Sequence, residues 1–167
     1  MAEPDSNDQE RLGALYSLSQ LSYIREDYRG TIDYLDRWFE LEEYPSSDAY
    51  ALLSTTYYQI EDFQSSLKNI EIAINMQESK DIPIKVDILD ENGNPTGEQK
   101  ETGETRKGVA KENHYLLKMA LYSELKRELD VLPIYEVLVQ WYPKKRYWTQ
   151  LSGLYGQRDR RLDQMGA

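Results

Sequence analysis

The sequence predicts an all-α fold, an α-solenoid in which helix-turn-helix repeats stack side by side and one insert interrupts them. The first observation behind this prediction is an internal repeat. Residues 15–28 and 50–63 match at a shift of 35 positions, and both end in Glu-Asp followed by an aromatic residue. The second is that apolar residues recur at steps of three and four after each matching segment, which indicates one buried face on each helix.

The first two repeats occupy residues 12–80 and follow an acidic N-terminus, residues 1–11, that we expect to be flexible. Acidic pairs lie in the turn between the two helices of each repeat, at 26–27 and 61–62. We interpret them as solvated residues that cap the second helix, because Asp side chains accept hydrogen bonds from the free N–H groups at a helix start.

Residues 111–167 hold a third repeat, from Tyr115 to Pro143, and a partial fourth. Asp130 is the expected N-cap of the second helix of repeat three, with Pro133 tolerated in its first turn. The fourth repeat begins at Trp148, 33 residues after Tyr115. Its aromatic, aliphatic and small residues fit the same motif as those of repeat two; they are Trp148, Leu151, Ser152 and Tyr155. We expect the repeat to end after its first helix, which leaves an apolar face open.

An insert at residues 81–110 separates repeats two and three. Its first part, Ile84-Lys-Val86-Asp-Ile88, alternates apolar and charged residues as a strand does. The turn-forming residues that follow include Asn92-Gly93, and the return segment is polar. We interpret the insert as a β-hairpin; the alternative is a disordered loop. A calcium loop is excluded because Ile88 and Gln99 stand where ligands are required.

Composition limits the chemistry of the chain. There is no cysteine and there is a single histidine, His114, which excludes thiolate chemistry and leaves little for a zinc site or a catalytic triad. We therefore expect no enzyme activity, no cofactor and no metal, and for His114 a surface or packing role. The net charge of −10 argues against a nucleic-acid partner. The N-terminus lacks a signal-peptide pattern, and no apolar run is long enough to span a membrane.

The four repeats resemble the tetratricopeptide family in period and in motif residues. This resemblance implies right-handed stacking, with the first helix of each repeat lining a concave groove that binds a peptide or an extended protein segment. The groove positions carried onto this chain, none of them a cation, are Tyr16, Ser17, Gln20, Tyr23, Leu52, Thr55, Tyr58, Leu117, Ala120 and Gln150. Family members that clamp a C-terminal carboxylate need cations there, so such a clamp is not expected.

Two shorter stretches, Lys111-Glu-Asn113 with Tyr115-Leu-Leu and residues 142–156, resemble bacterial repeat proteins encoded beside TonB/ExbB/ExbD energy-transduction systems. This resemblance implies a cell-envelope adaptor in the bacterial periplasm.

The sequence thus predicts a protein-interaction scaffold. The alternative is a self-assembling repeat protein that packs through an uncapped C-terminal repeat, since residues 144–167 carry a net charge of +4 and residues 1–80 a net charge of −10. The competing explanation for the partial fourth repeat is that the chain is a shortened form of a longer protein.

Overall fold

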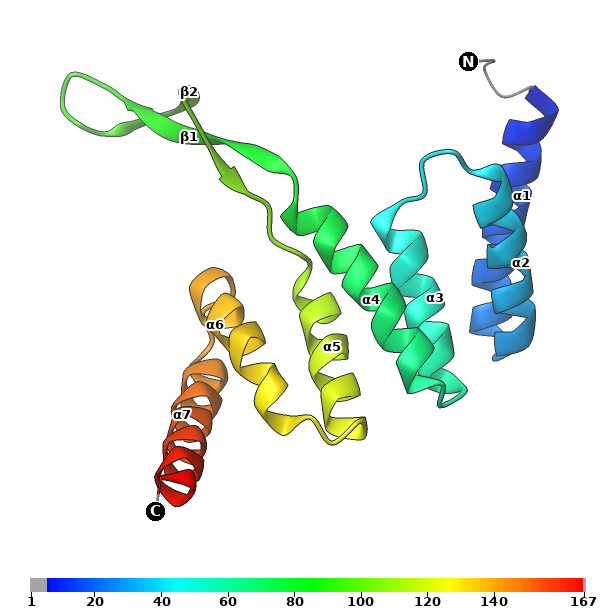
Figure 1. Cartoon of the computed structure of the whole chain (residues 1–167). Helices are drawn as coiled ribbons and strands as arrows, with labels where there is room; N and C mark the ends of the chain where they lie inside the picture. Colours follow the sequence, from blue (N-terminus) through cyan, green and yellow to red (C-terminus); the bar gives the residue numbers. More distant parts are fainter. Residues whose placement is uncertain (1–5, 167) are drawn as a thin grey trace.

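The computed structural model describes residues 6–166, which form helical pairs on either side of a long β-hairpin (Figure 1). The elements in chain order are α1 (Ser6–Ile24), α2 (Tyr28–Leu41), α3 (Ser47–Gln59), α4 (Phe63–Glu78), β1 (Asp81–Leu89), β2 (Pro95–Lys107), α5 (Glu112–Glu124), the 3₁₀ turn η1 (Glu128–Val131), α6 (Leu132–Trp141) and α7 (Lys145–Met165). The structure is thus mostly helical, as expected.

The turns inside the first two helical pairs follow one local design. Glu26 and Glu61 adopt left-handed backbone conformations, with φ of 61° and 63°, and each reverses the chain after the first helix. The next residue caps the second helix, since Asp27 accepts a hydrogen bond from the Gly30 N–H and Asp62 accepts one from the Ser65 N–H. The predicted capping role is confirmed for Asp27 and Asp62 but not for Glu26 and Glu61, which make the turn instead.

Small residues let the two helices of repeat two pack closely. The Ser54 hydroxyl of α3 donates to the Ser66 carbonyl of α4 at 2.7 Å, and the Ser66 hydroxyl donates to the Ser54 carbonyl at 2.8 Å. Both residues are completely buried. Such reciprocal bonds require the two backbones to approach each other directly, which no larger side chain at these positions would permit.

The third helical pair is more open than the first two (Figure 1). The residues 65 positions after Ser54 and Ser66 are Met119 and Val131, so both small positions carry bulky apolar side chains. Their volume separates α5 from α6. The space between α5, α6 and α7 is a hollow, and both residues line it.

Residues 81–107 form the predicted β-hairpin, which projects away from the helices (Figure 1). The strands are antiparallel, with Val86 opposite Lys100 and Asp87 opposite Gln99. The connecting turn contains the expected Gly93, whose φ of 81° suits glycine, and the Asp90 carbonyl accepts from its N–H. The disordered-loop alternative is therefore wrong.

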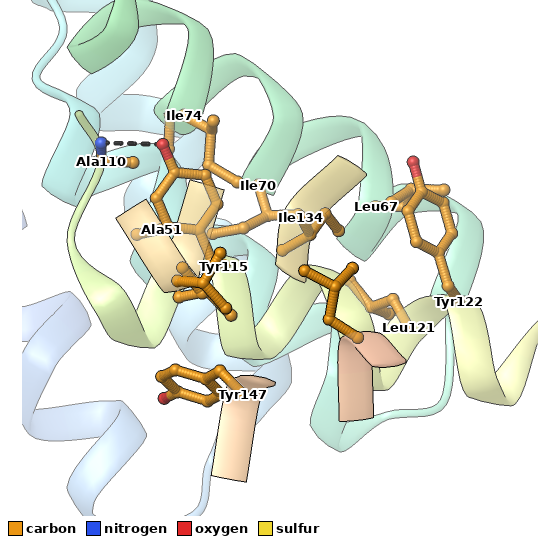
Figure 2. Close-up of a cluster of buried hydrophobic side chains, with 14 residues drawn as sticks. Ala51, Leu67, Ile70, Ile74, Ala110, Tyr115, Leu121, Tyr122, Ile134 and Tyr147 are labelled. Atoms are coloured by element: carbon orange, nitrogen blue, oxygen red, sulfur yellow. Dashed lines mark hydrogen bonds between the residues drawn. The ribbon is translucent and has the colours of Figure 1, made fainter. Parts of the chain in front are cut away.

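Two tyrosines hold the chain where the hairpin rejoins the helices. Tyr115 accepts a hydrogen bond from the Ala110 N–H at 3.1 Å, and the Tyr142 hydroxyl donates to the Ala110 carbonyl at 2.6 Å. The Tyr115 hydroxyl also donates to Glu78 at the end of α4, at 2.6 Å. Ala110 and Tyr115 belong to the main apolar core, which runs from α3 to α7 (Figure 2). A smaller core joins α1, α2 and α3 around Trp38.

The structure corrects two predicted helix starts. Residues 6–11 belong to α1, whereas the sequence assigned them to a flexible N-terminus; the rest of that segment lies outside the described residues. Asp130 does not cap a helix. It lies inside the 3₁₀ turn, where its carboxylate pairs with Arg127 at 2.6 Å, and α6 starts two residues later at Leu132.

The fourth repeat consists of one described helix, α7, whose motif residues are only partly buried. Tyr147 and Leu151 are buried, whereas Trp148 is 56% exposed and Ser152 is exposed. In repeat two the residue equivalent to Ser152 is Ser54, which bonds to the second helix of the pair, and among the described residues no such helix packs on α7. The basic segment after residue 157 continues α7 to Met165.

Candidate functional site

The candidate site is the face formed by the first helix of each pair, α1, α3, α5 and α7, which we call the A helices; α2, α4 and α6 are the B helices. Side-chain bridges link the starts of consecutive A helices. Lys111, the N-cap of α5, pairs with Asp48 of α3 at 2.7 Å. Lys144, the N-cap of α7, pairs with Glu112 of α5 at 2.7 Å, and the Tyr147 hydroxyl donates to the same carboxylate.

These bridges set the electrostatics of the A-helix starts. Hydrogen bonds from Lys144 and Tyr147 lower the pKa of Glu112, so this carboxylate stays charged. Each acid lies in the first turn of its helix, where the helix dipole favours negative charge. Charge pairs therefore connect the starts of α3, α5 and α7 at one end of the face.

A first hollow, of 420 Å³, opens between α1 and the start of α3, and we call it the N-terminal hollow. Tyr16, one of the predicted groove residues, lines it together with Trp38, and their ring centroids lie 5.3 Å apart. Burial raises the pKa of Tyr16, and the nearby Asp48 carboxylate raises it further. The hollow thus has an aromatic wall, a neutral phenol and an acidic rim, which Glu42 and Asp48 provide.

A second hollow, of 310 Å³, lies between α5, α6 and α7, and we call it the C-terminal hollow. Gln150, another predicted groove residue, lines it beside Gln157 and Ser123. The apolar part of the wall is made by Met119, Val131, Tyr135 and Leu154. This hollow exists because α5 and α6 are separated, so its position follows from the bulky residues of repeat three.

The predicted groove residues on α3 and α5 lie between the two hollows and are half-buried. Tyr58 and Leu117 pack against the main core, and Tyr58 also packs on Phe63 with centroids 5.5 Å apart. The Thr55 hydroxyl donates to the Ala51 carbonyl of its own helix. The remaining two are Leu52 and Ala120.

The other predicted residues lie on α1. Ser17 and Gln20 are exposed, whereas Tyr23 is half-buried and packs edge-on against Tyr28 at 5.6 Å. The structure therefore places Tyr16 and Gln150 in two separate hollows.

The sequence pattern did not identify Lys111, a cation at the start of α5 on this face. Lys111 lies one position before α5, outside the motif positions that were used to infer the groove. Its ammonium is engaged by Asp48, so it is not a free cation for a carboxylate ligand. The Lys111 N–H donates to the Gln77 side chain, which also lies 3.4 Å from His114. His114 is 6% exposed, so of the surface and packing roles expected for it, the structure shows the packing role.

Within residues 6–166, no group of three or more acidic or histidine side chains is placed to hold a metal ion. None of the helices in this range is both long and apolar enough to cross a membrane.

No family model and no curated protein matches the sequence. Solved structures do match the fold. The crystal structure of MamA superposes with a TM-score of 0.57 at 14% identity, covering 89% of this chain and 68% of that chain. The TPR (tetratricopeptide) domain of Arabidopsis OM64 superposes with a TM-score of 0.57 at 10% identity, covering 90% of this chain and 98% of that chain. The chain has a tetratricopeptide-type fold. At these identities the likeness concerns the fold alone.

Proposed function

We propose that this protein is an interaction scaffold, which binds an extended segment of a partner protein along the face of its A helices. The observation that carries the proposal is the pair of hollows at the two ends of that face. Each combines an aromatic or aliphatic wall with polar groups at its rim, which is the usual composition of a peptide-binding site.

The chemistry of the hollows defines the partner segment. The N-terminal hollow offers Tyr16 and Trp38 to an apolar side chain. The Glu42 carboxylate favours a neighbouring cation there, whereas Asp48 is already paired with Lys111. The C-terminal hollow offers Met119 and Leu154, with the amides of Gln150 and Gln157 free to bond an extended backbone. A segment with two apolar anchors and basic residues near the first of them fits both hollows.

Matched substitutions test this proposal. Gln20→Arg and Gln150→Arg place a long charged side chain on exposed positions of the A helices, and Gln64→Arg and Gln140→Arg do the same on exposed positions of the B helices. Partner recovery by the purified protein should fall at least tenfold for the first pair only. Equal recovery of the partner by all four variants would show that the A-helix face does not bind it.

A second candidate function is self-assembly through the last helix. It is supported by the exposure of Trp148, Leu162 and Met165, which are 56%, 59% and 83% exposed on α7. Trp148→Ser combined with Leu162→Ser should then weaken concentration-dependent association, as followed by light scattering. Association that is unchanged in this double variant would eliminate α7 as the contact.

A finer proposal is an adaptor role beside a TonB/ExbB/ExbD system in the bacterial periplasm. Its support is the sequence resemblance at residues 111–117 and 142–156. Chemical cross-linking in intact bacterial cells, followed by purification of this protein, should recover ExbB, ExbD or TonB. Recovery of cytoplasmic proteins alone would contradict the proposal.

A further inference from the structure

The hairpin carries an apolar surface that the helices do not use. The side chains of Ile82, Ile84, Val86 and Ile88 alternate along β1 and therefore share one face of the hairpin, which we call the aliphatic stripe. None of the four belongs to either buried apolar core; Ile82, Ile84 and Ile88 are half-buried on the hairpin, and Val86 is 42% exposed. Strand β2 is exposed along its whole length, and its side chains are mostly polar.

One edge of β1 is free to pair with another strand. The carbonyls of Ile84 and Ile88 accept hydrogen bonds from the hydroxyls of Thr102 and Thr96, at 3.1 and 2.8 Å, so they point toward β2. The direction of backbone groups alternates along a strand, so those of Lys85 and Asp87 point to the opposite, outer edge. Within the described residues β2 is the only strand paired with β1, which leaves that outer edge open.

We propose that the outer edge of β1 pairs antiparallel with β1 of a second copy of this chain, in a register centred on Val86. In this register Lys85 lies opposite Asp87 of the second copy, and the symmetry of the pair repeats the contact. Both residues direct their backbone groups to the outer edge, so each pair can form two ladder hydrogen bonds as well as a cross-strand ion pair.

Two neighbouring registers would also pair the outward backbone groups of Lys85 and Asp87, but repulsion between like charges disfavours both. Centring the contact on Lys85 places two lysines opposite each other, and centring it on Asp87 places two aspartates opposite each other. In the Val86 register Ile84 lies opposite Ile88 of the second copy, which makes the two aliphatic stripes continuous. Pro83 has no N–H to donate, so it limits the length of the ladder.

The product would be a four-stranded sheet between two scaffolds. An isolated two-stranded hairpin is marginally stable in water, and adding strands with an apolar face stabilises it. The contact is isologous, so it closes with two copies and does not extend into a fibre. It involves neither the A-helix face nor α7, so it goes beyond the proposed function and does not depend on it.

A charge-swap series tests the register in the full chain. Lys85→Asp and Asp87→Lys each place like charges opposite each other at both symmetric contacts of the dimer. We expect each variant to raise the dimer dissociation constant, measured by sedimentation velocity, by about tenfold or more. The double variant, Lys85→Asp with Asp87→Lys, restores both ion pairs and should return to within about threefold of the wild type. A wild-type chain that stays monomeric at about 1 mM, or a double variant no better than the single ones, would overturn the proposal.

A disulfide trap gives an independent measurement, because the chain has no cysteine of its own. In the proposed register Val86 lies opposite Val86 of the second copy in a non-hydrogen-bonded pair, where Cα atoms lie about 4.5 Å apart. This distance is within reach of a disulfide between two Val86→Cys chains. The control is Lys100→Cys, which lies opposite Val86 on the outer strand β2 and is also exposed. Val86→Cys should form the covalent dimer at least tenfold faster on mild oxidation. Equal rates for the two variants would refute the proposed register.

Discussion

The tyrosine that holds the junction between hairpin and helices gives a quantitative prediction. Tyr115→Phe deletes a hydroxyl that accepts from the Ala110 N–H and donates to Glu78, while the ring stays in place. Ala110 is completely buried and Tyr115 is 2% exposed, so water cannot replace the lost partner without opening the core. Leaving a buried N–H without an acceptor costs about 1–3 kcal/mol.

We therefore expect Tyr115→Phe to lower the free energy of unfolding by about 2 kcal/mol. In a chain of this length that corresponds to a fall in Tm of about 4–8 °C. Urea denaturation followed by circular dichroism at 222 nm measures the first quantity, and a thermal scan measures the second. Tyr44→Phe is the matched control, because Tyr44 is 73% exposed and its change should stay within about 0.5 kcal/mol.

The same hydroxyl should also contribute to the alkaline pH dependence. Burial and the bond to Glu78 raise the pKa of Tyr115 above its ordinary value of 10.0. The unfolded chain therefore loses this proton first, and the stability that Tyr115 contributes is full below pH 10 and declines above it. The difference in stability between wild type and Tyr115→Phe should shrink as the pH rises above 10. A Tyr115→Phe protein as stable as Tyr44→Phe, at neutral and at high pH, would refute the reasoning.

Three further predictions concern a cap, a junction and the single histidine. Asp62→Ala should cost about 1 kcal/mol in urea denaturation because Asp62 caps α4, whereas Asp130→Ala should cost less than half of that. Gly108→Ala should destabilise by about 1–3 kcal/mol, because a Cβ there would lie 2.2 Å from the Gln77 carbonyl oxygen. Burial and the nearby Lys111 lower the pKa of His114 despite the opposing effect of Asp48, so its NMR titration should have a midpoint below 6.5. Because the unfolded chain then binds the proton first, stability contributed by neutral His114 should be lost as the pH falls below 6.5.

Each of these three predictions would be contradicted by a different result. Equal losses for Asp62→Ala and Asp130→Ala would mean that the observed cap is not a source of stability. Gly13→Ala is the control for Gly108→Ala, because a Cβ at Gly13 meets nothing within 4 Å and should stabilise α1 by about 0.5–1 kcal/mol. A histidine midpoint at or above 6.5 would show that His114 is solvated or paired with an acid.

The repeat architecture was readable from the sequence because its determinants are local. The turn acids at 27 and 62 and the Asn92-Gly93 turn each act within a few positions of themselves, and the first two helix pairs, these two caps and the hairpin are confirmed. The helical start at Ser6 was missed because the acidic segment before residue 12 has no apolar periodicity.

The parts of the site that were missed depend on contacts between distant segments. Trp148 and Ser152 fit the motif, yet motif positions are buried only where a partner helix covers them. The C-terminal hollow depends on the combined volume of Met119 and Val131, which are 12 positions apart and on different helices. The bridge from Asp48 to Lys111 spans the whole insert, so no local pattern predicts it.

The most direct test of the scaffold account is site-specific photocross-linking to the bound partner. A photoreactive amino acid placed at Gln20 or Gln150 reports on the A-helix face, and the same amino acid at Gln64 or Gln140 reports on the B-helix face; all four positions are exposed. We expect one extended segment of the partner to be cross-linked from both Gln20 and Gln150, and we expect no adduct from Gln64 and Gln140. Adducts formed mainly from Gln64 and Gln140 would contradict it.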